Sequence, residues 1–287
     1  MGAGYTLKGW LKQIRWRLRR GEAALHYGRE QLNSMPAVLG NAMPKSGSHL
    51  IIQVLQGLTR LGPFVNPGFP PLNRTEDNAK LTDDRVLAGI QAMRPGDIGY
   101  GYISASGLFI SALTRPERAT IFVYRDPRDM IISHIFYATE IHQDHWMHRY
   151  YTETLNSMEE RINAAILGVQ EPGSELTPIC QRYAGYLGWL EQPEVLSLRF
   201  EDLILDQEKT LARLLDYLAA RGFTHQPERS LAVARLQQSI QPARSGTFRK
   251  GRPGNWQEYF TPANKSLFKE HTGSLLLRLG YEQDSAW

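Results

Sequence analysis

The stretch Pro44-Lys45-Ser46-Gly47-Ser48-His49 lies between two apolar runs, Ala37-Val38-Leu39 before it and Leu50-Ile51-Ile52 after it. This order predicts a strand, a tight turn and a helix. The first N–H groups of a helix have no partner within the helix, and the helix dipole adds to their attraction for an anion. Gly47 lets the backbone approach a ligand, and Lys45 supplies a positive charge. By itself the stretch fits an anion-binding turn and an ordinary strand-to-helix turn equally well.

The spacing of this turn differs from that of a Walker A loop. If Gly40 is the first glycine, such a loop needs a second glycine at position 45, where this chain has a lysine. The sequence therefore lacks the motif that is typical of ATP- and GTP-binding P-loop proteins.

The composition is that of an ordinary globular protein, with 287 residues of which 42% are hydrophobic. A chain of this length can bury a full core as one large domain. No segment reaches the run of about eighteen uncharged apolar residues that a membrane span needs, and the N-terminus lacks the apolar core of a secretory signal. The one cysteine, Cys180, excludes an internal disulfide and fits a reducing compartment. We therefore expect a cytoplasmic protein.

Positive charge is concentrated near the N-terminus. Residues 1–29 contain seven Lys or Arg and one Glu, a net charge of +6, whereas the whole chain has +4 and the remainder therefore sums to −2. The basic balance belongs to this segment, which argues against a nucleic-acid-binding surface on the body of the protein. We divide the chain into a basic amphipathic extension, residues 1–33, and one domain, residues 34–287.

Residues 5–20 are predicted to form a helix, because Leu7, Leu11, Ile14 and Leu18 recur at helical spacing among arginines. A basic amphipathic helix can lie peripherally on an anionic membrane surface. It can also pack its apolar side against its own domain. We favour packing against the domain and keep the membrane surface as the alternative.

Four strands separated by helices are predicted. The strands begin near Ala37, Asp97, Thr120 and Val195. The helices are expected at about 49–61, 83–93, 106–113, 128–139, 152–167, 177–190, 207–221, 228–238 and 263–278. Strands that alternate with helices form a mainly parallel sheet between two helical layers, so the expected fold class is three-layer α/β. Ligands bind at the carboxyl ends of such strands, and two of these ends carry a basic residue, Lys45 and Arg125.

Four segments contain residues suited to an anionic nucleotide. They are Pro44–Ser48, Tyr124–Ser133, Leu196–Leu203 and Arg249–Trp256. The second has Arg125 and Ser133 eight residues apart, and the fourth reads Arg-Lys-Gly-Arg-Pro-Gly-Asn-Trp. Each alone is compatible with a solvated turn or helix start. Together and in this order they resemble the sulfotransferases that use 3′-phosphoadenosine 5′-phosphosulfate (PAPS), and the resemblance extends over residues 36–281 or so.

The resemblance implies a P-loop-like nucleotide-binding architecture in which residues 34–287 are the sulfotransferase domain. Both ends of PAPS are anionic, so two separate basic clusters are needed. The family pattern assigns the 5′-phosphosulfate to Lys45, Ser46, Gly47, Ser48 and His49. It assigns the 3′-phosphate to Arg125, Ser133, Arg249, Lys250 and Gly251. Phe200 and Phe248 are candidates for contact with the adenine, because Leu50 stands where the family often has a tryptophan.

The resemblance also implies a role for Lys45 in the reaction. Transfer leaves negative charge on the oxygen between sulfur and the 5′-phosphate, which Lys45 and the helix N–H groups can stabilise. The products include adenosine 3′,5′-bisphosphate (PAP), and no metal is needed. His142, His145 and His148 step by three residues, whereas helical zinc-binding pairs step by four, so their spacing does not favour a metal site.

Several residues compete for the role of general base. One branch of the family uses a histidine in a His-x-Pro segment, and the best match in this chain is Tyr102-Ile103-Ser104. Phenols ionise at about pH 10 and are poor bases at neutral pH. The candidates are Tyr102, His49, which stands where a threonine is usual, and His134, which follows Ser133. An acceptor that needs little help is a further alternative.

We therefore predict a sulfotransferase that acts on a hydroxyl of a small-molecule, lipid or sugar acceptor, with an amine as the second choice. The aromatic side chains between Phe136 and Tyr151 favour an apolar or aromatic acceptor body, although sugars also stack on such rings. Two other classes stay open. One is a P-loop-type nucleotide phosphotransferase, and the other is a nucleotide-binding protein that has lost its catalytic base.

Overall fold

The computed structural model describes residues 7–224, 227–241 and 251–287. The chain forms two compact units. Unit 1 comprises Met1–Tyr124 and Gly188–Arg244, and unit 2 comprises Arg125–Leu187 and Ser245–Trp287. The border between them therefore falls directly after the strand that ends at Tyr124, so Arg125 is the first residue of unit 2.

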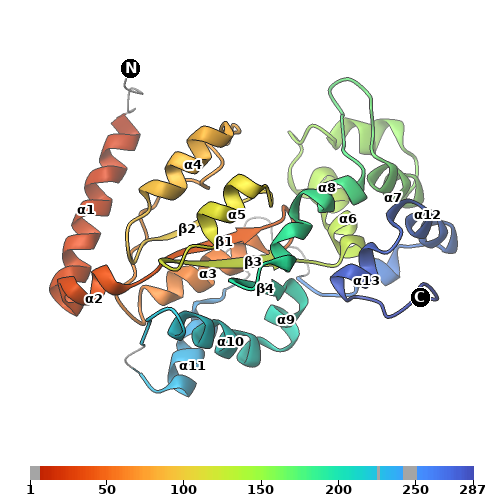
Figure 1. Cartoon of the computed structure of the whole chain (residues 1–287). Coiled ribbons are helices and arrows are strands. Elements are labelled where there is room, and N and C mark those ends of the chain that lie inside the picture. The colour runs from red at the N-terminus through yellow and green to blue at the C-terminus, as the bar shows by residue number, and fades with distance from the viewer. Residues whose placement is uncertain (1–6, 225–226, 242–250) are drawn as a thin grey trace. The chain divides into compact units, whose positions relative to one another are not determined.

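A four-stranded parallel sheet forms the centre of unit 1 (Figure 1). Its strands are β1 (Ala37–Ala42), β2 (Ile98–Gly101), β3 (Arg118–Tyr124) and β4 (Val195–Arg199), in the order β2-β1-β3-β4. Every residue of β1 is buried, as expected for an apolar strand that is covered on both faces. The predicted α/β class with a parallel sheet is confirmed.

One face of the sheet is covered by α3 (Ser48–Leu58), α10 (Gln207–Ala219) and α11 (Arg229–Ser239). These helices bury leucine, isoleucine and valine side chains at three- and four-residue intervals, among them Ile51, Leu55 and Leu58 of α3 and Leu211, Leu214, Leu215 and Leu218 of α10. Gly40 of β1 allows the close approach of α3, because a Cβ there would lie 2.9 Å from the Leu55 side chain.

The other face of the sheet is covered by α4 (Asp83–Ala92), α5 (Gly107–Leu113) and the 3₁₀ turn η3 (Gly188–Glu191). The buried hydroxyl of Thr120 in β3 donates to the carbonyl of Leu113 at the end of α5 over 2.7 Å. Unit 1 therefore has the three layers that the alternation of strands and helices predicts.

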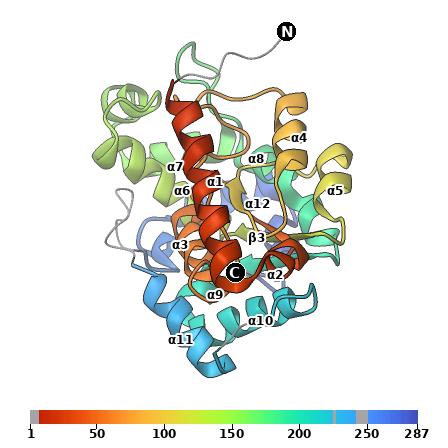
Figure 2. The same ribbon diagram turned by 90° about the vertical axis from the view of Figure 1, so that its left-hand side faces the viewer.

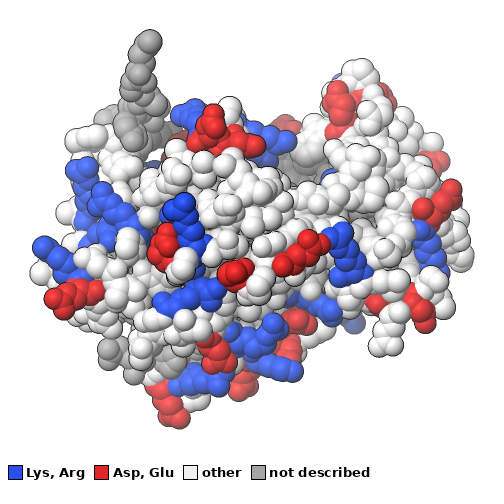
Figure 3. All heavy atoms as spheres, in the orientation of Figure 1, with Lys and Arg blue, Asp and Glu red and all other residues white. Residues whose placement is uncertain are grey.

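Two helices precede the sheet, α1 (Leu7–Tyr27) and α2 (Arg29–Ser34), so the N-terminal helix is longer than predicted. The face of α1 that docks on unit 1 bears Trp16 and Arg20, which donate to the buried Asp97 carboxylate over 2.9 and 2.8 Å. Lys12 forms an ion pair of 2.6 Å with Glu76. Figure 2 shows α1 along the side that faces the viewer, and Figure 3 shows Lys and Arg side chains gathered over the same helix.

Unit 2 consists of helices and short helical turns. They are α6 (Pro127–Phe136), the π-helical turns η1 (Tyr137–Ile141) and η2 (Tyr150–Thr154), α7 (Met158–Leu167), α8 (Ile179–Leu187), the 3₁₀ turn η5 (Asn255–Glu258), α12 (Pro262–Thr272) and α13 (Leu275–Leu279). The buried Arg128 bonds to Asp126 over 2.7 Å and to Glu282 over 2.6 Å. Its guanidinium lies 3.9 Å from the ring centre of Trp256 and 4.4 Å from that of Trp287. This side chain is a structural hub of unit 2.

Several predicted helix boundaries are wrong for local reasons. The helix expected over residues 263–278 is two helices, because Gly273 between them has a φ of 55°. The helix expected over 152–167 starts only at Met158, after a capping box formed by Ser157 and Glu160. Phe200–Leu205, where no helix was predicted, forms the short helix α9.

Asn41 is a buried polar residue in the apolar strand β1, and we predict that it stabilises unit 1. Its side chain exchanges two hydrogen bonds with the main chain of Ile103, of 2.8 and 2.9 Å. The substitution Asn41→Ala leaves the Ile103 N–H without its partner, and we expect the free energy of unfolding to fall by about 3 kcal/mol. Urea denaturation measures this change, and the exposed Asn33→Ala in α2 is the matched control. A loss no larger than that of the control would contradict the prediction.

Candidate active site

The turn after β1 has an unusual main chain. Lys45 has a φ of 66° and Gly47 a φ of 93°, so both lie in the left-handed region. For a residue with a Cβ this conformation costs about 1–2 kcal/mol, and such strain is concentrated at functional sites. The turn is held by main-chain bonds from Met43 to Val123 and from Ser46 to Met43, of 3.2 and 3.1 Å. The strained main chain therefore lies at the lysine itself.

The turn presents several hydrogen-bond donors without partners. The Ser46 side chain is fully buried, and its Oγ has no hydrogen-bond partner among the described residues. The same holds for the main-chain N–H groups of Gly47, Ser48 and His49 within the described chain, since α3 has no side-chain cap and its first internal bond comes from Leu50. An anion that accepts from these groups would satisfy them. The predicted anion-binding residues of unit 1 thus lie together in one turn.

Phe200 packs against this turn. A Cβ at Gly47 would lie 2.5 Å from the Phe200 ring, so the ring fills the space that any other residue at position 47 would need. Phe200 is the first residue of α9, and most of its surface is buried in the core of unit 1. The structure places it beside the Lys45 turn, and its contact with an adenine remains a prediction.

His49 lies in the first turn of α3, with its side chain exposed to solvent. Partial loss of hydration, followed by the positive charge of Lys45, lowers the pKa of His49 below the ordinary 6.5. The neutral imidazole is therefore the main form at neutral pH, and it can accept a proton.

Tyr102 follows β2 and is half-buried. Its N–H donates to Asn73 Oδ1 over 3.0 Å, and its carbonyl accepts from Asn73 Nδ2 over 2.9 Å. The next residue, Ile103, is bound by Asn41 in the same way and also accepts a bond of 2.9 Å from Trp189 Nε1. The sequence analysis missed both asparagines. The amide of Asn41 in an otherwise apolar strand was the available sign, whereas nothing in the loop sequence marked Asn73.

In unit 2, Asp129 connects two of the predicted phosphate-binding segments. This carboxylate is buried, and it accepts hydrogen bonds of 2.8 Å from the main-chain N–H groups of Gly254 and Trp256. One of its oxygens lies 3.6 Å from Nη2 of Arg125. Asp129 therefore fixes the chain after Gly251 and orients Arg125 at the same time.

The helix α6 carries Ser133 and His134. Asp126 caps its N-terminus by accepting from the N–H of Arg128 over 2.8 Å. His134 is buried, and its Nδ1 lies 3.3 Å from the hydroxyl of Tyr151. Burial raises the pKa of Tyr151, so this hydroxyl keeps its proton. His134 thus lies in a packed aromatic cluster of unit 2, whereas Ser133 is half-buried.

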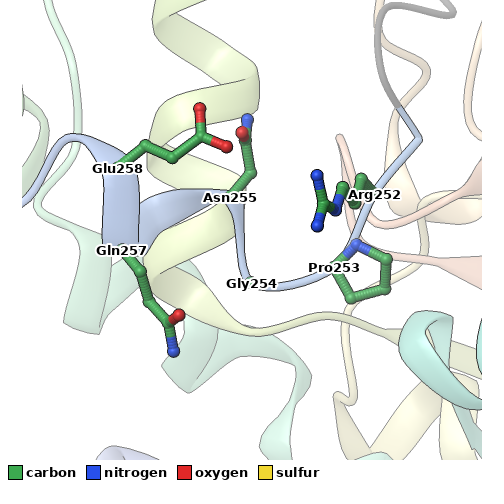
Figure 4. A pocket seen from close by; sticks show the side chains of 6 residues that line it. All are labelled: Arg252, Pro253, Gly254, Asn255, Gln257 and Glu258. Carbon is green, nitrogen blue, oxygen red and sulfur yellow. The ribbon is translucent and has the colours of Figure 1, made fainter.

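The fourth segment is described only in part. Phe248, Arg249 and Lys250 lie outside the described residues. Gly251 has a φ of 57°. An open hollow follows, lined by Arg252, Pro253, Gly254, Asn255, Gln257 and Glu258 (Figure 4). Asn255 and Glu258 point to one side of this loop and Gln257 to the other. Among the described residues no group of three His, Cys, Asp or Glu side chains is arranged as metal ligands.

One comparison with known proteins identifies a family. A family model described as the sulfotransferase domain matches residues 104–280. The matched range contains Arg125, Ser133 and the fourth segment, and it begins after the Lys45 turn and Tyr102. A search of curated proteins found no match.

Solved structures share the fold at low sequence identity. A mouse sulfotransferase, SULT7A1 complexed with PAP, is 16% identical with a TM-score of 0.59, covering 93% of this chain and 94% of that one. Retinol dehydratase in complex with androsterone and the inactive cofactor PAP is 14% identical with a TM-score of 0.54, covering 91% and 85%. Retinol dehydratase with retinol and PAP is 16% identical with a TM-score of 0.51, covering 91% and 86%.

We expect Asp129→Asn to weaken the binding of PAP at least tenfold. In the wild type, both oxygens of the Asp129 carboxylate accept main-chain N–H groups, and one of them also lies near Arg125. The amide of the variant replaces one oxygen by an N–H₂ group, which cannot accept from an N–H donor. Arg125 and the chain after Gly251 therefore lose the carboxylate that they share. Titration calorimetry with PAP and with 5′-AMP measures the effect. Affinity for 5′-AMP should change little, because it lacks the 3′-phosphate. Asp144→Asn, at an exposed position of unit 2, is the matched control, and equal PAP affinity of the two variants would contradict this role.

Proposed function

We propose that this chain, which belongs to the sulfotransferase domain family and is a PAPS-dependent sulfotransferase, transfers the sulfuryl group to a hydroxyl of its acceptor. The acceptor is a small molecule, lipid or sugar, and an amine is the second choice. The observation that carries this proposal is the Lys45 turn, whose buried Ser46 hydroxyl and three main-chain N–H groups have no partner among the described residues. These groups and the lysine suit the sulfate and phosphate oxygens of the donor.

We assign the two ends of the donor to different residues. Lys45, Ser46, Gly47, Ser48 and His49 bind the 5′-phosphosulfate. Arg125, Ser133, Arg249, Lys250 and Gly251 bind the 3′-phosphate, with Phe200 and Phe248 against the adenine. The link from Asp129 to Arg125 and to Gly254 supports the second assignment, because it ties two of these segments to one carboxylate.

The reaction forms a bond between the acceptor oxygen and sulfur while the bond from sulfur to the 5′-phosphate oxygen breaks. The electron pair of that bond leaves with PAP, so negative charge grows on the bridging oxygen. Lys45 and the N–H groups of the turn stabilise this charge. The proton of the acceptor hydroxyl passes to a base. No metal takes part in these steps.

His49 is the base that we propose among the three candidates. It is exposed to solvent and hence accessible to an acceptor, it lies on the same turn as Lys45, and its lowered pKa keeps it neutral. His134 is buried beside Tyr151, which argues against direct contact with an acceptor. Tyr102 offers a phenol, a poor class of base at neutral pH.

The acceptor is proposed to have an apolar or aromatic body. The retinol dehydratase structures that share the fold contain androsterone or retinol. In unit 2 the segment from Phe136 to Tyr151 carries several rings, including His145 stacked on Trp146 at 3.8 Å. We further propose that residues 34–287 are the catalytic domain, that residues 1–33 are an extension, and that the protein acts in the cytoplasm.

Ligand binding and transfer test the function. We expect PAP to bind the wild type at least tenfold more tightly than 5′-AMP, and the double substitution Arg249→Ala plus Lys250→Ala to remove this difference. Labelled PAPS with a panel of hydroxyl acceptors should give a sulfated product in the presence of a metal chelator, and Lys45→Ala should lower the rate about 100-fold.

Equal binding of PAP and 5′-AMP, or transfer that requires magnesium, would favour a phosphotransferase. Binding of PAP without transfer to any acceptor would favour an inactive nucleotide-binding protein.

The base is tested by single-turnover rates at saturating PAPS. We expect His49→Ala to lower the rate about 100-fold, whereas Tyr102→Phe and His134→Ala keep it within a few-fold. Because a base must be deprotonated, the rate should rise with pH and level off once the imidazole is neutral. Loss of rate in His134→Ala alone would show that the proposal chose the wrong residue.

A second measurement on His49 does not depend on activity. An NMR titration of the wild type and of Lys45→Ala gives the pKa of the imidazole directly. Removing the neighbouring positive charge should raise that pKa, while the part that comes from lost hydration persists. An unchanged or lower pKa in Lys45→Ala would mean that the two side chains do not interact.

A further inference from the structure

The N-terminal helix α1 has an apolar face that points to solvent. The described residues contain eleven exposed large apolar side chains, and four of them, Trp10, Leu11, Leu18 and Leu25, are on this one helix. Leu11, Leu18 and Leu25 are seven residues apart, and with Trp10 they cover an arc of about 100° of the helix surface. Leu25 is 90% exposed. Four such side chains in one arc form a continuous stripe, whereas scattered single apolar residues would need no explanation.

The stripe lies opposite the face by which α1 docks. Lys12, Trp16 and Arg20, which bond to Glu76 and Asp97, occupy the arc on the far side of the helix axis. Docking on unit 1 therefore leaves the stripe uncovered, and Figure 2 shows α1 on the outside of this unit. The docked position and an outward binding surface are compatible on the same helix.

Arginines border the stripe on both sides. At 100° per residue, Arg15 follows the edge formed by Leu11, and Arg17 follows the edge formed by Trp10. Both are exposed, and neither has an ion pair with another described residue. Glu22, the one acidic residue of α1, is exposed and lies at the same edge as Arg15. Figure 3 shows the basic side chains gathered over this helix.

We propose that the outward face of α1, made of Trp10, Leu11, Leu18, Leu25, Arg15 and Arg17, binds the surface of an anionic lipid bilayer. A tryptophan and leucines on one side with arginines along both edges is the pattern of helices that lie in the membrane interface. The leucines enter the boundary of the acyl chains, and the arginines bind the headgroups. The described chain has no helix with the length and apolar composition to cross the bilayer, so the contact is peripheral.

The same features argue against a second copy of the chain as the occupant. A stable dimer buries about 800 Å² on each partner through some 20 or more residues, and one helix face of four apolar side chains is smaller than that. A two-fold contact through the stripe would also bring the arginines of two copies together, whereas an anionic surface neutralises them. This inference does not depend on the transfer reaction.

Vesicle sedimentation of the full chain tests the proposal. We expect binding to phosphatidylcholine vesicles with 30 mol% phosphatidylserine, weaker binding to phosphatidylcholine alone, and a loss of binding as salt rises. Leu18→Glu plus Leu25→Glu should weaken binding at least tenfold. Arg15→Gln plus Arg17→Gln should remove the preference for the anionic vesicles. Leu205→Glu plus Leu231→Glu changes two leucines of unit 1 that are 74% and 48% exposed outside α1, and should leave binding unchanged.

Each variant is also examined for helicity, thermal stability and PAP affinity, which should equal those of the wild type because all the changed side chains are exposed. Absence of wild-type binding to either vesicle would overturn the proposal. So would equal binding of the Leu18, Leu25 variant and its control. A dimer in solution that the Leu18, Leu25 variant dissolves, without vesicle binding, would show that the stripe binds a second copy instead.

Discussion

The left-handed main chain at Lys45 and Gly47 is the constraint on which the candidate site of unit 1 depends. The chain must leave the central strand β1, which is buried on both faces, and enter α3 within a few residues. Phe200 fills the space beside Gly47, so a residue with a Cβ at position 47 would collide with the core. The packing of the core therefore holds the turn in this shape, with its N–H groups and Ser46 Oγ already in place. Such preorganisation is what electrostatic stabilisation of a developing charge requires.

Unit 2 buries several charged side chains within a few residues, and each of them must be stabilised away from water. Burial raises the pKa of Asp126, while burial would lower that of Arg128; the bonds of Arg128 to Asp126 and Glu282 nevertheless raise its pKa above the ordinary value. These charges are tolerable inside because each has hydrogen-bonded partners. In the same short segment, Asp129 turns toward Arg125 and the chain after Gly251. In this run, Asp126 and Arg128 therefore stabilise the unit, whereas Asp129 orients Arg125.

The class of the fold could be predicted because local sequence patterns determine it. Apolar runs gave the four strands, and alternation with helices gave the parallel sheet. The split roles of Arg125 and Arg128 have no such local sign, since both follow the same strand and only their distant partners, Trp256, Trp287 and Glu282, distinguish them. The hydrogen bonds of Asn73 to Tyr102 were missed for the same reason, whereas the amide of Asn41 in an apolar strand was a sign that could have been used. Long-range hydrogen bonds are determined by the fold and leave little trace in periodicity.

The N-terminal helix was predicted correctly, but the face by which it docks was not. The leucine spacing predicted an amphipathic helix, and an apolar face is ordinarily the one that packs inward. The docking of α1 is determined instead by the buried carboxylate of Asp97, whose pKa burial raises and whose bonds from Trp16 and Arg20 offset part of that cost. A buried carboxylate without partners is unfavourable, so the helix must turn Trp16 and Arg20 toward it. The leucines lie on the opposite side of the helix and are thereby held outward, because one polar contact beneath the helix fixes its rotation.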